Sequence, residues 1–217
     1  MEKINQQAPF PQTAMSEAAA LSKRTTRGRW KLFSVLAVCA APMLLSYLAY
    51  YVIKPQGRTN YGELLDPRAH PMPVLQAHEQ GAPERGVVGL EAFRGKWLML
   101  TVDSGACATA CEKKLYDVRQ LRLVQGKEMD RIERIWLVDD AQTVAPRLLN
   151  EFAGMHALTV DAAQLRSWLP VAEGGQLSEH IYLVDPLGNL MMRYPKDADP
   201  NKIKKDLAKL LRASAIG

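Results

Sequence analysis

The fold of this chain is decided by one stretch of its sequence, Trp97-Leu98-Met99-Leu100-Thr101-Val102-Asp103-Ser104-Gly105-Ala106-Cys107-Ala108-Thr109-Ala110-Cys111. The stretch opens with an apolar run that ends in Ser and Gly, which predicts a strand and then a tight turn. Two cysteines four positions apart follow the turn, and a helical pattern continues to about Val124. Cys107 is therefore expected at the turn and Cys111 in the first helical turn, with both sulfurs on one side.

This position favours reactive cysteines. The amino end of a helix carries partial positive charge and free N–H donors, and both favour the thiolate that attacks disulfides and binds soft metals. A structural disulfide is the alternative interpretation. A bridge that closes so few residues stabilises a fold only slightly, so the pair indicates soft-metal or redox chemistry.

Strands and helices alternate after Trp97. We expect strands over 97–103, 132–138, 157–160, 180–184 and 190–194, and helices over 109–124, 143–152, 161–168 and 201–212. Between the last two strands, Asp185-Pro186-Leu187-Gly188-Asn189 predicts the turn of an antiparallel hairpin. This order predicts a thioredoxin-like α/β fold over residues 87–217, with a central mixed sheet flanked by helices.

The N-terminal region predicts a membrane anchor. A disordered basic tail is expected over residues 1–31, followed by 22 uncharged residues from Leu32 to Ile53. A helix of that length spans about 33 Å, enough for a hydrocarbon core of about 30 Å. A retained anchor is favoured over a cleaved signal peptide, whose apolar region usually has about 7–15 residues.

Charge predicts the topology of the anchor. The net charge is +5, of which residues 1–31 contribute +4 and residues 32–217 only +1. Basic residues before the span place the N-terminus in the cytoplasm, so the domain is expected on the periplasmic side of a bacterial inner membrane. A nearly neutral domain excludes a nucleic-acid-binding protein of the usual basic type. Residues 54–86, rich in Pro and Gly, predict a linker, with one short strand near Val87–Leu90.

The spacing of the cysteines also permits metal binding. Three intervening residues allow a disulfide, but they also let two thiolates approach one ion, and two thiolates with an imidazole suit Cu(I). His180, at the start of the strand before the hairpin, is the preferred third ligand, and a partly buried structural histidine is the alternative. His156 is a reserve ligand. Asp139 and Asp140 are expected on the same rim of the sheet as the cysteines.

At this point the chain resembles the Sco/SenC family, the membrane-anchored, thioredoxin-like copper chaperones of cytochrome c oxidase assembly. The resemblance covers residues 85–212. It rests on Arg94-Gly95-Lys96-Trp97, Cys107-x-x-x-Cys111, Trp136-Leu137-Val138-Asp139 and Ile181-Tyr182-Leu183-Val184-Asp185-Pro186-Leu187-Gly188. Ala108 and Glu112 replace the prolines that usually follow the family's cysteines, and Leu177 stands at the position of the family histidine. The chain is therefore identified as a divergent member.

The resemblance implies that Cys107 and Cys111 bind Cu(I), with His180 as the candidate histidine. It also implies that the chain helps mature the copper site of cytochrome c oxidase subunit II, by delivering metal or by reducing its cysteines. Two alternatives stay open. One is a membrane-tethered thiol-disulfide oxidoreductase with Cys107 and Cys111 as catalytic residues, and the other is a non-catalytic scaffold for oxidase assembly.

Overall fold

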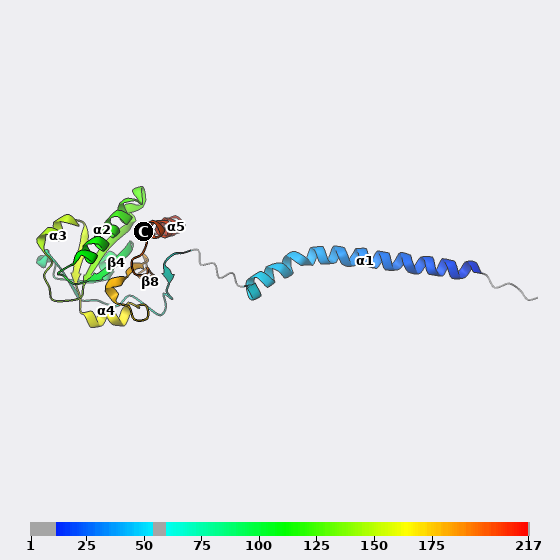
Figure 1. Ribbon diagram of the computed structural model, residues 1–217, viewed down its shortest axis with the longest axis horizontal. Coiled ribbons are helices and arrows are strands. Elements are labelled where there is room, and N and C mark those ends of the chain that lie inside the picture. Colours follow the sequence, from blue (N-terminus) through cyan, green and yellow to red (C-terminus); the bar gives the residue numbers. More distant parts are fainter. Residues whose placement is uncertain (1–11, 54–59, 217) are drawn as a thin grey trace, which may run out of the picture. The chain divides into compact units, whose positions relative to one another are not determined.

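The computed structural model describes residues 12–53 and 60–216 (Figure 1). The chain divides into two compact units, Met1–Gly57 and Arg58–Gly217. The described part of the first unit is the helix α1 (Gln12–Leu48), which continues as a π-helical turn at Ala49–Ile53. Residues 1–11, 54–59 and 217 lie outside the described residues.

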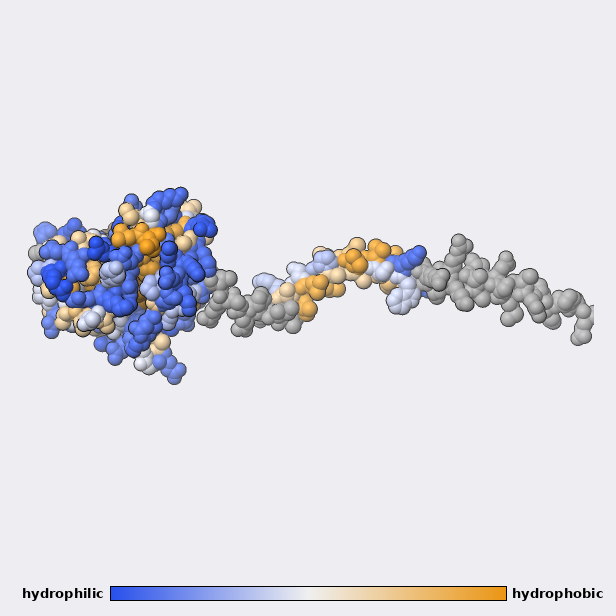
Figure 2. All heavy atoms as spheres, turned by 45° about the horizontal axis from the view of Figure 1, so that its top comes forward, coloured by the Kyte–Doolittle hydropathy of each residue, from blue (hydrophilic) through white to orange (hydrophobic). Residues whose placement is uncertain are grey.

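The anchor expected over residues 32–53 is confirmed as a helix that is long and apolar enough to cross a membrane. The apolar window runs from Arg29 to Tyr51 and has a mean hydropathy of 2.1. Its large apolar side chains, among them Phe33 and Leu44, are exposed rather than packed into a core (Figure 2). A helix that is apolar on all sides requires an apolar surrounding, which a bilayer provides.

The N-terminal tail differs from the disordered segment that was expected. The chain is helical from Gln12 onward, whereas residues 1–11 lie outside the described part of the chain. Ala18, Ala19 and Ala20 are strong helix formers, and extending an existing helix requires no new nucleation.

The second unit is built on an eight-stranded mixed sheet of order β1-β8-β7-β4-β5-β6-β2-β3. Its strands are β1 (Glu63–Leu64), β2 (Ala77–Glu79), β3 (Val87–Val88), β4 (Trp97–Asp103), β5 (Ile132–Val138), β6 (Met155–Thr159), β7 (Ile181–Val184) and β8 (Leu190–Arg193). Strands β4, β5 and β6 run parallel, whereas β7 is antiparallel to both β4 and β8. β4 and β5 have the bounds that the sequence predicts.

Helices cover both faces of this sheet (Figure 1). The described α-helices of this unit are α2 (Thr109–Leu123), α3 (Pro146–Glu151), α4 (Ala162–Trp168) and α5 (Pro200–Ala213). Leu98 and Leu100 of β4 pack in one cluster with Trp168 of α4. The alternate residues Trp97 and Met99 pack in a second cluster with residues of α2 and α5. This period-2 alternation places α4 opposite α2 and α5 across the sheet, and the predicted thioredoxin-like fold is confirmed.

The linker expected over residues 54–86 is corrected from Tyr61 onward, because the chain there belongs to the fold. β1 pairs with β8, and β2 lies between β6 and β3. Leu75 and Ala77 are buried in the core. Strands of two or three residues are too short to show an alternating pattern, so the Pro and Gly content dominates the sequence signal. The short strand expected near Val87–Leu90 is present as β3.

A buried carboxylate fixes the chain where it enters this fold. Asp206 of α5 is 2% exposed, and its Oδ2 accepts hydrogen bonds from the N–H groups of Tyr61 at 2.7 Å and Gly62 at 2.9 Å. The Tyr61 hydroxyl accepts from the N–H of Asp199, the N-cap of α5, at 3.2 Å. Tyr61 and Gly62, near the start of the described domain, are therefore attached to α5.

We expect Asp206→Ala to lower the free energy of unfolding by about 2 kcal/mol or more, because two N–H groups lose their acceptor. Urea unfolding of the full chain in detergent, followed by tryptophan fluorescence, measures this change. Lys205→Ala, an exposed position of the same helix, is the control and should stay within about 0.5 kcal/mol of wild type. Equal unfolding midpoints for the two variants would contradict the role of Asp206.

Candidate redox and metal site

The two cysteines lie where strand β4 gives way to helix α2. The N–H of Cys107 donates to the carbonyl of Ser104 at 3.1 Å, which closes a turn directly after β4. α2 begins two residues later, at Thr109. Cys107 and Cys111 form a disulfide, with their Cα atoms 5.1 Å apart. The predicted arrangement of strand, turn and helix is therefore present, with both sulfurs at the first turn of α2.

Cys107 has an unusual backbone conformation. Its φ is 41°, in the left-handed region, and Asp197 is the other non-glycine with positive φ among the described residues. For an L-residue this conformation costs roughly 1–2 kcal/mol. Residues in such conformations persist where their surroundings impose them, and they are concentrated at functional sites.

The disulfide is buried in an apolar cluster. Cys107 is 5% exposed and Cys111 is 2% exposed. The cluster around them consists of side chains from α2, β5, β6 and the α3 region, namely Leu115, Trp136, Val138, Val144, Leu148, Phe152 and Ala157. Attack on a sulfur requires access, so exchange with another thiol needs a local opening of this cluster. Cys107, at the turn, is the less buried of the two.

Asp140 holds the cysteine turn in place. Its Oδ1 accepts hydrogen bonds from the N–H of Gly105 at 3.0 Å and from the N–H of Gln142 at 3.1 Å. Gly105 approaches the chain after β5 so closely that a Cβ atom there would lie 2.2 Å from the Gln142 carbonyl oxygen. Only glycine fits this contact. The expectation that Asp139 and Asp140 share a rim with the cysteines agrees with this arrangement.

The neighbouring carboxyl groups on this rim differ in acidity. Burial, with a contribution from the carboxylates of Asp140 and Asp103, raises the pKa of Asp139. Burial also acts to raise the pKa of Asp140, but hydrogen bonds from Ser104, Gly105 and Gln142 bring that pKa below its ordinary value. Asp140 therefore holds the turn as an ionised carboxylate, whereas Asp139 takes up a proton more readily.

Lys114 is a residue of this site that the sequence did not indicate. Its Nζ lies 2.6 Å from Asp103 Oδ2 and donates to the Val102 carbonyl at 3.1 Å. It also donates to the carbonyl of Ser178, two residues before His180. Lys114 thus connects α2, the end of β4 and the turn before β7. Only its position in the sequence, one helical turn after Cys111, could have indicated this role, and a lysine on a helix is usually solvated.

His180 is buried at the start of β7, 2% exposed. Its Nδ1 lies 2.8 Å from the Tyr194 carbonyl, so this nitrogen carries the hydrogen, and Nε2 accepts from the Ala172 N–H at 3.4 Å. Burial lowers the pKa of His180, which favours the neutral imidazole. A neutral ring held through Nδ1–H by a carbonyl has a lone pair on Nε2, the form that binds metals.

The structure does not bring His180 into a ligand group with the cysteines. Its ring contacts that of Tyr182, with centroids 5.9 Å apart, and Tyr182 packs in the same cluster as Trp168 of α4. The cysteines pack in a different cluster with α2 residues. In the described part of the chain, no three His, Cys, Asp or Glu side chains gather closely enough to hold a metal ion. The ligand set of Cys107, Cys111 and His180 therefore stays a prediction.

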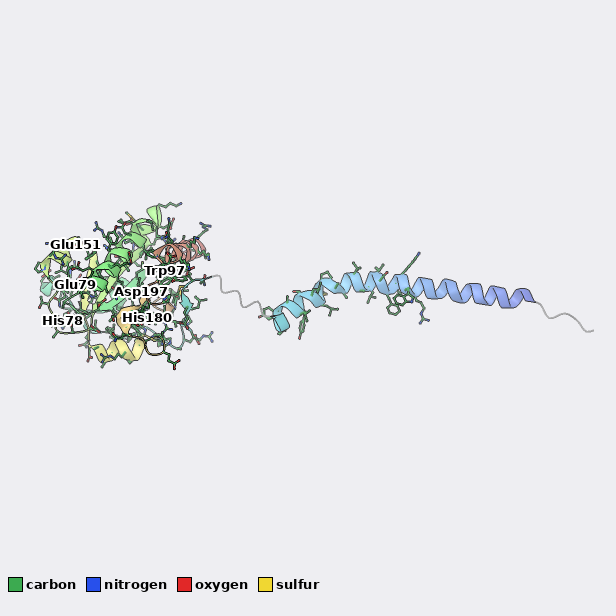
Figure 3. All side chains as sticks on the ribbon, viewed as in Figure 1. His78, Glu79, Trp97, Glu151, His180 and Asp197 are labelled. Atoms are coloured by element: carbon green, nitrogen blue, oxygen red, sulfur yellow. A yellow bond between two sulfur atoms is a disulfide. The ribbon has the colours of Figure 1, made fainter. Side chains whose placement is uncertain are left out.

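The reserve ligand His156 belongs to a separate ion-pair cluster. Its Nδ1 lies 2.7 Å from Glu79 Oε1, and Glu79 Oε2 lies 2.7 Å from Arg85 Nη1. Figure 3 shows Glu79 beside His78 near one side of the domain, apart from His180. His156 is thus engaged between β6 and β2.

The second unit is a mixed sheet with helices on both faces and a disulfide at the start of one of the helices, and this arrangement defines a thioredoxin-like protein. The chain also carries a helix that is long and apolar enough to cross a membrane. The chain belongs to the family described as "Transmembrane-like, thioredoxin-like, C-terminal domain", whose model matches residues 97–214. A second model, "Transmembrane-like, N-terminal domain", matches residues 23–52. No curated protein matches the sequence.

Solved structures of Sco proteins have the same fold, which confirms the predicted resemblance at the level of structure. Arabidopsis thaliana ScoI with copper bound aligns at a TM-score of 0.53 and 18% identity, covering 67% of this chain and 100% of that chain. Yeast Sco1 with copper bound aligns at a TM-score of 0.53 and 13% identity, covering 68% of this chain and 95% of that chain. A SCO1/SenC family lipoprotein from Bacillus anthracis aligns at a TM-score of 0.51 and 17% identity, covering 68% of this chain and 97% of that chain.

We expect Asp140→Ala to destabilise the domain by about 1–3 kcal/mol, because the Gly105 and Gln142 N–H groups lose their acceptor. The same change should accelerate reduction of the Cys107–Cys111 disulfide by dithiothreitol, since the turn is released. Urea unfolding and stopped-flow fluorescence measure the two effects.

Asp139→Ala is the matched control, since burial raises the pKa of Asp139 and so disfavours its ionised form in the fold. The control should be neutral or slightly stabilising at pH 7. If dithiothreitol reduced the Cys107–Cys111 disulfide of both alanine variants at the wild-type rate, Asp140 would not control the turn.

Proposed function

We propose that this chain is a membrane-anchored assembly factor that acts through the Cys107–Cys111 couple on cysteines of the copper site of cytochrome c oxidase. The observation that carries the proposal is the disulfide at the amino end of α2, with Cys107 in a left-handed backbone conformation. Together with the anchor helix, it gives a thiol-disulfide couple tethered at a membrane. The fold shared with Sco structures supports an oxidase partner, with subunit II as its copper-binding component.

The basic residues before the anchor support a cytoplasmic N-terminus and a periplasmic domain in a bacterial inner membrane. An oxidising compartment of this kind keeps paired cysteines bridged unless they are actively reduced. Copper-binding cysteines of a partner would also oxidise there, so they need a reducing dithiol before metal enters.

The exchange proceeds in two steps. In the reducing direction, the Cys107 thiolate attacks a disulfide of the partner, which forms a mixed disulfide and releases one partner thiolate. Cys111 then attacks the Cys107 sulfur and releases the second partner thiolate, so that the partner is reduced and Cys107–Cys111 is oxidised. A cellular dithiol reductant returns the pair to the thiol form. The reduction potentials of the couples decide the direction.

The Cys111→Ser variant should accumulate a mixed disulfide with its partner, because the thiol that resolves the intermediate is missing. Membranes treated with a thiol-blocking reagent and separated without reductant reveal this adduct on a gel. Cys107→Ser is the matched variant and should trap at least tenfold less, since it lacks the attacking sulfur. Cys39→Ser controls for the third cysteine. Equal trapping by both serine variants of the couple, or none, would reject the exchange mechanism.

A second function, Cu(I) delivery, is favoured by His180. Its Nδ1 is engaged by a backbone carbonyl, while Nε2 accepts one long hydrogen bond, so a metal at Nε2 would displace only that bond. Two thiolates released by reduction would supply the soft ligands that Cu(I) prefers. In the oxidised state the sulfurs are bonded to each other and cannot bind the ion. Copper loading therefore requires reduction and a rearrangement that brings His180 to the cysteines.

Titration of the reduced full chain in detergent, against a chromophoric Cu(I) chelator, should give one Cu(I) per chain. Cys107→Ser should weaken binding at least a hundredfold and His180→Asn at least tenfold, because each removes one ligand. Circular dichroism of each variant establishes that the fold is retained. A Cys107→Ser protein that binds as tightly as wild type would exclude this site, and an effect of the cysteines without one of His180 would leave a two-thiolate site.

A further inference from the structure

Helix α5 concentrates positive charge on its solvent face. Five of its side chains are basic and exposed: Lys202, Lys204, Lys205, Lys209 and Arg212. Its single acidic residue, Asp206, is buried beneath that face. α5 therefore carries a charge of +4, although residues 32–217 as a whole carry only +1. The remainder of that region is net acidic, so the charge is segregated rather than dispersed.

The same helix receives the chain that comes from the membrane anchor. Tyr61 donates its N–H to Asp206, its hydroxyl accepts from Asp199, and the Lys202 ammonium lies 5.0 Å from the centre of its ring. These three contacts are with α5 or its N-cap, and the Tyr61 ring also lies beside that of Tyr194, with centroids 6.4 Å apart. The point at which the tether joins the domain is thus beside the basic face.

The tether is short. Ten Cα-to-Cα steps separate Tyr51, the last residue of the apolar window, from Tyr61. Even a fully extended chain of ten residues spans only about 35 Å. The length of the chain therefore limits the Tyr61 Cα, and the start of α5 that Tyr61 contacts, to that distance from the Tyr51 Cα.

Exposed apolar side chains stand at the other end of α5. Leu187, in the β7–β8 turn, is 63% exposed, and Ile216, after α5, is 53% exposed. Both line a pocket of about 240 Å³ together with Trp97 and Leu210. The buried Nε1 of Trp97 has no hydrogen-bond partner. Basic residues along a helix and apolar residues at its end are the combination that suits a lipid surface.

We propose that α5 and the Leu187–Ile216 edge form a docking surface for anionic phospholipid headgroups of the membrane that holds the anchor. The lysines and Arg212 contact the headgroup phosphates, while Leu187 and Ile216 enter the interfacial layer. Docking fixes which face of the domain is turned from the bilayer. This surface is independent of the chemistry proposed for the cysteines.

The test places the photoreactive amino acid p-benzoylphenylalanine at Ile216 in the full chain, reconstituted in nanodiscs. One set of nanodiscs contains phosphatidylcholine alone, and the other contains 30% phosphatidylglycerol. After illumination, mass spectrometry of the intact protein measures the lipid adduct. We expect at least threefold more adduct with the anionic lipid, and a decrease toward the phosphatidylcholine value in 0.5 M salt.

The matched position is Val87, which is 56% exposed on β3 at the sheet edge opposite β1. It should give little adduct in either lipid. Lys204→Glu/Lys205→Glu should abolish the preference for anionic lipid at Ile216. Arg147→Glu/Arg166→Glu, on α3 and α4, makes the same change of net charge elsewhere and should keep the preference.

A lipid adduct at Ile216 no greater than at Val87 would overturn the inference, as would an adduct indifferent to phosphatidylglycerol. If both double variants abolished the preference for anionic lipid equally, the effect would come from the net charge of the protein, and α5 would be rejected as the docking surface. In those cases an acidic protein surface would be the alternative partner for the basic face.

Discussion

The parallel pairing of β4 with β5 is the constraint on which the site depends. Seven residues of each strand pair without interruption, from Trp97 with Ile132 to Asp103 with Val138. Both strands therefore end at one rim, and the turns that follow them meet. Asp140 reaches Gly105 across this rim, and the Gly105 backbone leaves no room for a side chain. A shift of one residue in the β4–β5 register would move the Asp140 carboxylate away from the Gly105 N–H and the cysteine turn.

Burial of the disulfide gives the domain a closed oxidised state. The apolar cluster around the two sulfurs limits the access of water and thiols, so exchange at Cys107 requires a local opening. For the proposed exchange, this requirement would favour a partner that docks on this rim and opens the cluster. Lys114 links the cysteine helix to the turn before His180. The cysteine helix and the turn before His180 are therefore held together by this one side chain.

The anchor and the basic face of α5 act on different scales. The anchor helix keeps the domain at a membrane, because 22 uncharged residues cannot be left in water. Headgroup contacts, which are weaker and sensitive to salt, would restrict how the domain turns on its tether. Under the proposed docking, the two together would limit the orientations that the cysteine rim can adopt at the membrane.

The sequence by itself determined the elements with strong periodicity. The membrane anchor, β4, β5 and the hairpin turn follow from apolar runs and turn residues, which act locally. The bond between Cys107 and Cys111 was also within reach, since four positions on a helix span a short distance. Tertiary structure alone decided the edge strands β1 and β2, the hydrogen bonds by which Asp140 holds the cysteine turn, and the burial of His180 against the Tyr194 carbonyl. These depend on contacts between residues far apart in sequence and on the face of the sheet to which a strand residue points, which no local pattern records.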